Sequence, residues 1–243
     1  MKAIPCEWSD VFPGGVPGWV IFITQSKDIR SRLSLICGTT DANDNDLAEL
    51  SLIGLIAYFE GFVRYHFASC VNICPQLLSR FVRARPETVI PLRDIADMDT
   101  IHGCVGFILA DGLGFTSPKE INAQFRDLLG VTPFSKDESS VYEVLLHDRH
   151  QIVHSAGIYT TKYLRAHKGG MSAEQDRVYM DSVVITPSRV IEAADFLMAM
   201  TEKIVTATDA CLADPANWHS ANEMASMDEH RSLFKWTAAA CGP

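Results

Sequence analysis

A run of apolar side chains at helical spacing, between residues 47 and 71, most constrains the fold of this chain. Its apolar positions recur every three or four residues: Leu52, Leu55, Ile56, Phe59, Val63 and Phe67. An α-helix has about 3.6 residues per turn, so these side chains share one face of it. The run predicts the clearest helix of the chain, and other periodic segments also favour helices. We therefore expect an all-α protein.

The segment 19–37 could form either a strand or a helix. Residues 19–24 are rich in aromatic and β-branched side chains, which favour a strand. Ile29 and Leu33 nevertheless continue the segment at helical spacing, and Gly38 can end a helix. Because a lone strand would have no obvious partner here, we predict a helix.

Start and stop signals predict three further helices. Ser117, Pro118 and Glu120 form a good start for a helix that runs to residue 129. A similar start at residues 135–138 opens the helix that carries the most informative pattern. Residues 187–212 form a last long helix.

Two other segments predict little regular structure. We expect residues 86–116 to be a long connection with one short helix. Residues 160–185 should form a loop or a short extended pair that turns at Gly169 and Gly170.

No stretch with the composition of a linker divides the chain, so we predict a single domain over residues 1–243. A bundle of four to six helices is expected over residues 19–213. Proline and glycine predict an irregular arm over residues 1–18, and a polar tail follows over residues 214–243.

Composition limits what the chain can do. Its formal net charge is −9, so any nucleic-acid site must be local rather than spread over the whole surface. No run of about 18 uncharged apolar residues is present, which predicts no membrane span. The seven cysteines show no paired CxxC spacing, and the first residues do not resemble a secretory signal. We therefore expect a cytoplasmic protein with reduced thiols.

The segment 148–157 reads Asp-Arg-His-Gln-Ile-Val-His-Ser-Ala-Gly. Arg149 and His154 lie five residues apart near the end of a predicted helix, before Gly157, which can stop it. Five residues correspond to roughly 140° of rotation, so the two side chains do not share one face. Both could still reach a groove that crosses the end of the helix.

A helical wheel separates two sides of this helix. Asp148 lies in the apolar face and Arg149 in an extended apolar arc, so each needs a partner or a covering subunit. The other side carries a polar stripe at spacings of four, three and four: Glu143, His147, His150 and His154.

This segment resembles the motif of the HEPN family of all-helical domains. The family motif is an Arg, a polar residue, a few mostly apolar residues and a His, near the end of the third main helix. Here Arg149 is followed by His150 in the polar position, and Ile152 and Val153 precede His154. The Ser-Ala-Gly sequence that follows is similar to the sequence after the motif in HEPN proteins of bacterial defence and toxin systems.

The resemblance implies a HEPN-like bundle and a metal-independent endoribonuclease without a cofactor. Many family members are homodimers in which two copies of the motif face one cleft. Arg149, His154 and His150 would be the catalytic residues, RNA the substrate, and an antitoxin protein a partner. Family members often carry an acidic residue on a long helix ahead of the motif, to which Glu60 loosely corresponds; Glu60 could equally be a charge on the surface of its helix.

RNA cleavage requires the residue types of this motif. RNA carries its own nucleophile, the 2′-hydroxyl, so cleavage needs a base, an acid and a cation for the charged phosphorane. His titrates near neutral pH, and Arg presents a fixed fork to phosphate oxygens. Residues 147–168 carry a net charge of +3 in a chain of −9. We expect four residues there to bind substrate: His147, Lys162, Arg165 and Lys168.

The role of His150 is open at this level. Family members commonly carry a small polar residue there, which holds a phosphate without proton transfer, so positioning is the favoured role. His154 follows four residues later, so the two imidazoles are neighbours on the helix. Because two nearby cations disfavour each other, the pair could also supply one acid and one base.

Two other interpretations of the motif helix stay open. A neighbouring pair from the polar stripe could bind a metal ion, although the whole stripe spans about 16 Å, too far for one ion. Alternatively, the histidines are exposed and Arg149 forms a structural salt bridge with an acid such as Glu60. The protein would then be a catalytically silent module that binds a partner protein or a nucleotide. The complete motif on a helix among helices favours the ribonuclease.

Two further clusters predict less. His66, Cys70 and Cys74 lie four residues apart, which could indicate a metal site but is more typical of a core. The second is a small basic cluster that comprises Arg80, Arg83 and Arg85. Such a cluster usually marks a solvated face and less often a phosphate contact.

Overall fold

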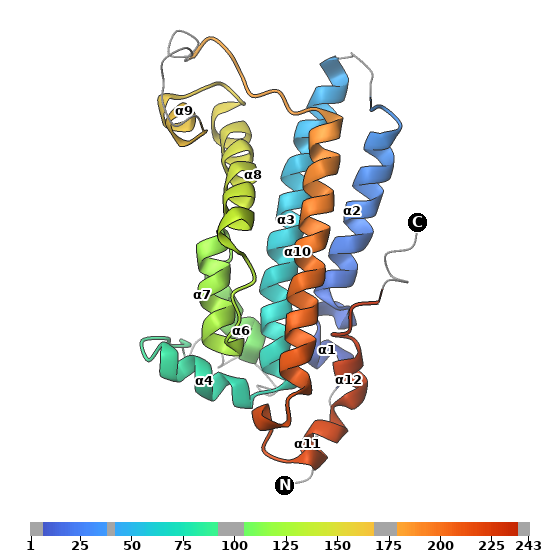
Figure 1. The fold of residues 1–243 in the computed structure, drawn as a ribbon, viewed down its shortest axis with the longest axis vertical. Helices are drawn as coiled ribbons and strands as arrows, with labels where there is room; N and C mark the ends of the chain where they lie inside the picture. The colour runs from blue at the N-terminus through green and yellow to red at the C-terminus, as the bar shows by residue number, and fades with distance from the viewer. Residues whose placement is uncertain (1–6, 38–41, 92–104, 168–178, 238–243) are drawn as a thin grey trace. The chain divides into compact units, whose positions relative to one another are not determined.

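The computed structural model describes residues 7–37, 42–91, 105–167 and 179–237, and these ranges are predominantly helical (Figure 1). Pairing of β type is limited there to an isolated antiparallel bridge between Ile158 and Ser182. The expectation of an all-α protein is confirmed.

Within the described ranges, five helices have twelve or more residues: α2 (Gly18–Ser34), α3 (Ala42–Ile73), α7 (Pro118–Leu129), α8 (Lys136–Ser155) and α10 (Pro187–Ala213). Shorter elements connect or flank them: α1 (Trp8–Val11), η1 (Pro13–Gly15), α4 (Gln76–Ala84), α6 (Val105–Asp111), α9 (Thr161–His167), η3 (Pro215–Asn217), α11 (Ala221–Ser226) and α12 (Asp228–Ser232). With eleven α-helices described, the expected count of four to six is wrong. A helix of one or two turns is too short to show a helical period, so the sequence pattern does not reveal it.

The long helices lie where the periodicity places them. Helix α2 covers residues 19–34 of the ambiguous segment 19–37, so the interpretation as a helix is confirmed over that range. Gly38, expected to end this helix, lies outside the described residues. At the start of α7, the side chain of Ser117 accepts a hydrogen bond from the Glu120 N–H. Gly130 ends α7 with a left-handed φ of 77°, a conformation that favours glycine.

Both terminal arms contain more regular structure than expected. Helices α1 and η1 lie in the first arm, and η3, α11 and α12 lie in the tail. The rings of Phe12 and Phe234 join these arms at a centroid distance of 5.4 Å. Trp19 donates a hydrogen bond from its indole N–H to the Leu233 carbonyl at 2.8 Å. Such tertiary contacts stabilise helices that are too short to be stable alone.

The chain divides into two compact units. The first comprises Met1–Thr24, Glu60–Phe134 and Ala199–Pro243, and the second comprises Gln25–Phe59 and Ser135–Met198. The single domain over residues 1–243 stays a prediction.

Aromatic contacts contribute to the core of each unit. In the first unit the ring of Phe67 lies 5.6 Å from that of Phe81 and 5.3 Å from that of Phe115. In the second unit the rings of Phe59 and Tyr142 meet edge to face at 5.4 Å. All six side chains of the apolar run in α3 are fully buried, as its spacing predicts.

The segment 160–185, expected to be a loop or an extended pair, contains a helix. Helix α9 occupies Thr161–His167, and the Thr160 hydroxyl accepts a hydrogen bond from the Tyr163 N–H at 3.2 Å at its start. An extended pairing is also present, as the bridge between Ile158 and Ser182. Gly169 and Gly170 lie outside the described residues.

Two general properties can be stated for the described ranges. None of their helices has both the length and the apolar character needed to cross a bilayer. Their free cysteines are Cys37, Cys70, Cys74 and Cys211.

The two faces of α3 predict very different costs of mutation. Leu52 is 0% exposed and Leu50, two residues earlier on the same helix, is 68% exposed. Leu52→Ala should lower the free energy of unfolding by about 2–5 kcal/mol, because it leaves a cavity in the core. Leu50→Ala should change it by no more than about 0.5 kcal/mol. Urea denaturation followed by circular dichroism measures both; equal effects would contradict the burial of this face.

Candidate active site

Helix α8 carries the candidate residues, and local signals determine both of its ends. Ser135 and Glu138 form a reciprocal capping box, in which the Glu138 carboxylate accepts from the Ser135 N–H at 2.7 Å. At the other end, Ala156 and Gly157 have left-handed φ values of 48° and 76°. The left-handed turn begins one residue before the glycine, and His154 lies in the last helical turn.

The two sides of α8 differ as the helical wheel predicts. The buried residues are Tyr142, Leu145, Asp148 and Gln151. Three histidines of the polar stripe are exposed: His147, His150 and His154. Arg149 is half-buried, and its Nε atom is buried without a hydrogen-bond partner among the described residues. Within that part of the chain, the salt bridge suggested for Arg149 is not found.

His150 and His154 are in direct contact. Their ring centroids lie 4.4 Å apart, with planes tilted by 48°, as the spacing of four residues predicts. The pKa of His150 lies below its ordinary value, first because the imidazole loses hydration and then because positive charges lie nearby. Those charges belong to His154, Lys162, Arg149 and His147. The lowered pKa favours the neutral form of His150, which can accept a proton.

Asp148 has the partners that its place in the apolar face requires. Its carboxylate is fully buried and accepts a hydrogen bond from the Tyr163 hydroxyl at 2.6 Å. The Arg189 guanidinium, at the start of α10, forms an ion pair with the same carboxylate. Burial and the bond to Asp148 raise the pKa of the Tyr163 hydroxyl. The charge of Asp148 is thus neutralised inside the unit.

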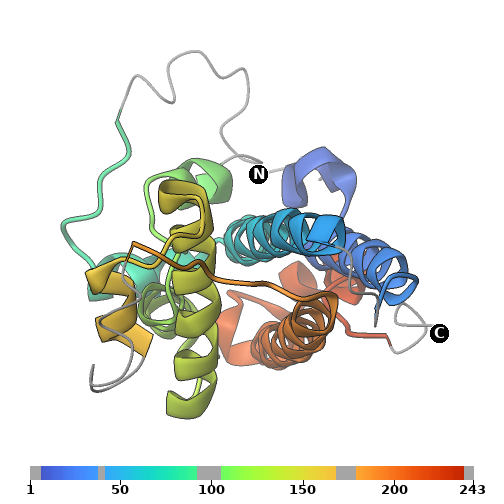
Figure 2. The same cartoon turned by 90° about the horizontal axis from the view of Figure 1, so that it is seen from above.

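Gln151 fixes the loop that leads from α8 to α9. Its amide nitrogen donates to the Ile158 carbonyl, and its amide oxygen accepts from the Thr160 hydroxyl at 3.3 Å. Figures 1 and 2 both show α9 beside the C-terminal end of α8. This arrangement brings the exposed side chain of Lys162 within electrostatic range of His150.

Some of the predicted site residues lie close together in the structure, and others do not or lie outside the described residues. His147, Arg149, His150, His154 and Lys162 form one local cluster. Arg165 is exposed on α9, but no described contact joins it to the histidines. Lys168 lies outside the described residues.

Sequence reasoning missed two residues of this region, Tyr163 and Arg189. The buried position of Asp148 indicated that a partner was needed but not which residue would supply it. A search for a cation or hydroxyl near the start of the following helices would have included Arg189. Tyr163 lay in a segment that was not expected to be helical.

The structure gives limited support to the interpretation that histidines or cysteines of this chain bind a metal ion. Within the described ranges, no group of three or more His, Cys, Asp or Glu side chains could hold an ion. His66 is buried beside Thr208, with 3.1 Å between Nε2 and the hydroxyl, and burial lowers its pKa to about 3. Cys70 and Cys74 are also buried. The interpretation of these three residues as core is confirmed.

The basic cluster on α4 divides into structural and exposed residues. Arg85 donates from Nε to the Asp127 carboxylate at 2.6 Å, so its charge is used within the fold. Arg80 and Arg83 are exposed and line a pocket of about 700 Å³. A phosphate contact at this pocket stays a prediction.

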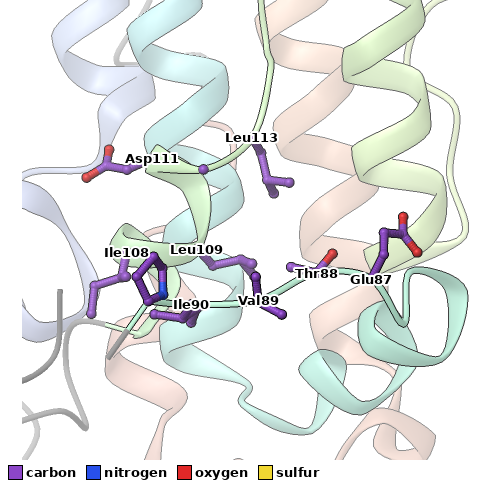
Figure 3. Close-up of a pocket in the computed structure, with 10 residues that line it drawn as sticks. Glu87, Thr88, Val89, Ile90, Ile108, Leu109, Asp111 and Leu113 are labelled. Carbon is purple, nitrogen blue, oxygen red and sulfur yellow. The ribbon is translucent and has the colours of Figure 1, made fainter. Parts of the chain in front are cut away.

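Another pocket, of about 530 Å³, lies between residues 87–91 and α6 (Figure 3). Apolar side chains such as Val89, Ile108 and Leu109 line it, and Glu87 and Asp111 are its charged residues. Among the described residues that line it, none is basic. This pocket therefore does not suit a phosphate, and the histidine cluster of α8 is the stronger candidate for chemistry on RNA.

A comparison of this chain with models of protein families, with curated proteins and with solved structures finds no match. The likeness of residues 149–154 to the HEPN motif therefore stays a resemblance, and the chemistry of that family enters only as a proposal.

Proposed function

We propose that this chain is a metal-independent endoribonuclease of the HEPN type, a cytoplasmic homodimer with a role in bacterial defence or as a toxin. The observation that carries the proposal is the contact of His150 with His154 beside Arg149. Lys162 adds to the local positive charge that a phosphate backbone needs. RNA is the substrate class because its 2′-hydroxyl supplies the nucleophile that these side chains lack.

The proposed reaction uses each of the three residues once. Neutral His150 takes the proton of the 2′-hydroxyl, and the 2′ oxygen attacks the adjacent phosphorus. Arg149 stabilises the negative charge of the phosphorane. Protonated His154 gives its proton to the 5′ oxygen as the bond from phosphorus to that oxygen breaks. The products are a 2′,3′-cyclic phosphate and a 5′-hydroxyl, and proton exchange with water restores both histidines.

The lowered pKa of His150 supports its role as the base. A residue that only holds a phosphate works best as a cation, whereas a base must be neutral before the reaction. Loss of hydration and then the charges around His150 disfavour its cationic form. The lowered pKa therefore favours the base over the positioning role suggested by the small polar residue that the family commonly has there.

A second copy of the chain completes the proposed site. Arg149 and His154 point roughly 140° apart around α8, so one chain does not direct both at a single phosphate. A twofold axis beside the end of α8 would place two Arg–His sets around one cleft. Val153, which is 47% exposed beside His154, offers apolar area that a second copy can cover.

Truncation of the catalytic side chains tests the activity. Arg149→Ala and His154→Ala should each lower cleavage of labelled RNA by about 100-fold or more, because each removes a group that acts in the transition state. Arg32→Ala and His219→Ala change exposed residues of the same types elsewhere and should cleave normally. Circular dichroism and sedimentation should show an unchanged fold and assembly in all four variants.

EDTA separates this mechanism from the metal interpretation. Cleavage by the wild-type chain should be unaffected by EDTA, because no step uses a metal ion. Activity that disappears in EDTA and returns with added zinc would instead support a metal-binding histidine pair. A wild-type chain that cleaves none of a varied set of RNAs would point to the catalytically silent module.

Mixed dimers test the shared site. Sedimentation at micromolar concentration should show a dimer, which Val153→Arg should weaken by placing like charges across the axis. Leu50→Arg, on an exposed position of α3, is the matched control and should stay dimeric. Mixing inactive Arg149→Ala and His154→Ala chains should restore part of the activity, because each mixed dimer retains one Arg and one His. A monomeric wild type would contradict the shared site.

The pH dependence of cleavage tests the role of His150. A base acts in its neutral form, so the acidic limb of the wild-type profile should lie below about pH 6.5, the ordinary pKa of histidine. His150→Asn should slow cleavage roughly 10- to 100-fold and remove that limb. His219→Asn should leave both unchanged. Near-normal cleavage by His150→Asn with an unchanged profile would instead assign His150 to positioning the phosphate.

A further inference from the structure

A stacked pair of tyrosines lies beside the candidate active site. The rings of Tyr159 and Tyr163 have centroids 5.6 Å apart and planes inclined by only 17°. Tyr159 lies in the loop after α8, and Tyr163 lies one turn later, in α9. Both residues are partly exposed, so solvent reaches part of the stack.

The pair is held in place from several directions. The Tyr163 hydroxyl donates to the buried Asp148 carboxylate at 2.6 Å. The N–H of Tyr159 donates to the Asp181 carbonyl at 2.8 Å, and its carbonyl accepts from the Tyr179 N–H at 2.9 Å. An aromatic ring on a backbone that is already ordered loses little conformational freedom when a ligand stacks on it.

The surroundings of the stack are cationic. Lys162 and Arg165 lie on either side of Tyr163 in α9, and both are exposed. The positive charge of Lys162 interacts electrostatically with His150. Of the acids near the stack, Asp148 is buried against Arg189, and the Asp181 carboxylate accepts a hydrogen bond from the Ser182 N–H at 2.8 Å.

A third tyrosine lies next to the stack along the backbone. Tyr179 is hydrogen-bonded to the backbone of Tyr159, and 67% of it is exposed. Exposed aromatic rings that alternate with basic side chains are the combination that binds single-stranded nucleic acid: the rings stack on bases and the cations contact phosphates.

We propose that the Tyr159–Tyr163 stack is the binding platform for an unpaired nucleobase next to the phosphate that is cleaved, so the substrate is single-stranded RNA. The inference rests on the proposed ribonuclease for the identity of the strand. A base within a duplex is stacked on its neighbours and paired, and its face is closed to a protein ring. An unpaired base can turn out of the strand and place one face on the tyrosines.

Binding to uncleavable RNA tests the platform apart from catalysis. The probe is a single-stranded 2′-O-methyl oligonucleotide with 2-aminopurine at one position, which has no 2′-hydroxyl to react. Wild-type chain should bind it and quench the aminopurine fluorescence by stacking at one register. Tyr159→Leu should weaken binding roughly 5- to 100-fold, the effect of losing one stacked base, and should abolish the quenching.

Matched variants separate stacking from folding. Tyr159→Phe keeps the ring and should bind within about twofold of wild type, because every base has a π-face for which the ring suffices. The thermal unfolding midpoints of the two variants should be similar. The same oligonucleotide annealed to its complement should bind more weakly than the single strand. Equal affinity and quenching in wild type and Tyr159→Leu, or a duplex bound as tightly as the single strand, would overturn the platform.

The two proposals can fail separately. If uncleavable single strands bind through Tyr159 but no natural RNA is cut, the platform stands and the ribonuclease fails. If RNA is cut equally well by wild type and Tyr159→Leu, the ribonuclease stands and the platform fails.

Discussion

The buried carboxylate of Asp148 is the interaction on which the arrangement around α8 depends. A carboxylate in an apolar face is costly unless it is paired and hydrogen-bonded. Arg189 and Tyr163 supply those bonds from two different elements, the start of α10 and α9. One buried charge therefore ties three helices of the second unit together. Truncating either partner would leave the carboxylate underbonded, so the bond also specifies which face of α9 meets α8.

This bond also shapes the local electrostatics. Because Asp148 is neutralised by Arg189, it offsets little of the positive charge on the solvent side of α8. The pKa of His150 falls, first because the imidazole loses hydration and then because its neighbours are cationic. A chain of net charge −9 thus presents a local positive surface. In the proposed ribonuclease, the positive surface would attract the substrate, and the lowered pKa of His150 would provide the base.

Local sequence signals predicted much of the fold, whereas features that depend on tertiary packing were not predicted. The caps at Ser117 and Ser135 and the apolar run of α3 depend on residues a few positions apart, so sequence reasoning found them. Contact between His150 and His154 followed from a spacing of four. Helix α9 is only two turns long, and its bond to Asp148 joins residues fifteen positions apart. Thr160 caps its start, but the placement of Tyr163 and Lys162 against α8 depends on packing that no local pattern contains.

The placement of Arg149 is not explained by the stability of the fold alone. Its half-buried guanidinium has a buried Nε without a hydrogen-bond partner in the described ranges, an arrangement that costs free energy. The neighbouring Asp148 demonstrates that this unit does pair a charge where the fold requires it. An unsatisfied donor beside a fully satisfied one is expected where an external ligand supplies the missing acceptor. In the proposed ribonuclease, a phosphate oxygen would be that acceptor, since the planar fork of arginine can bind phosphate with two parallel hydrogen bonds, whereas lysine would supply only a point charge.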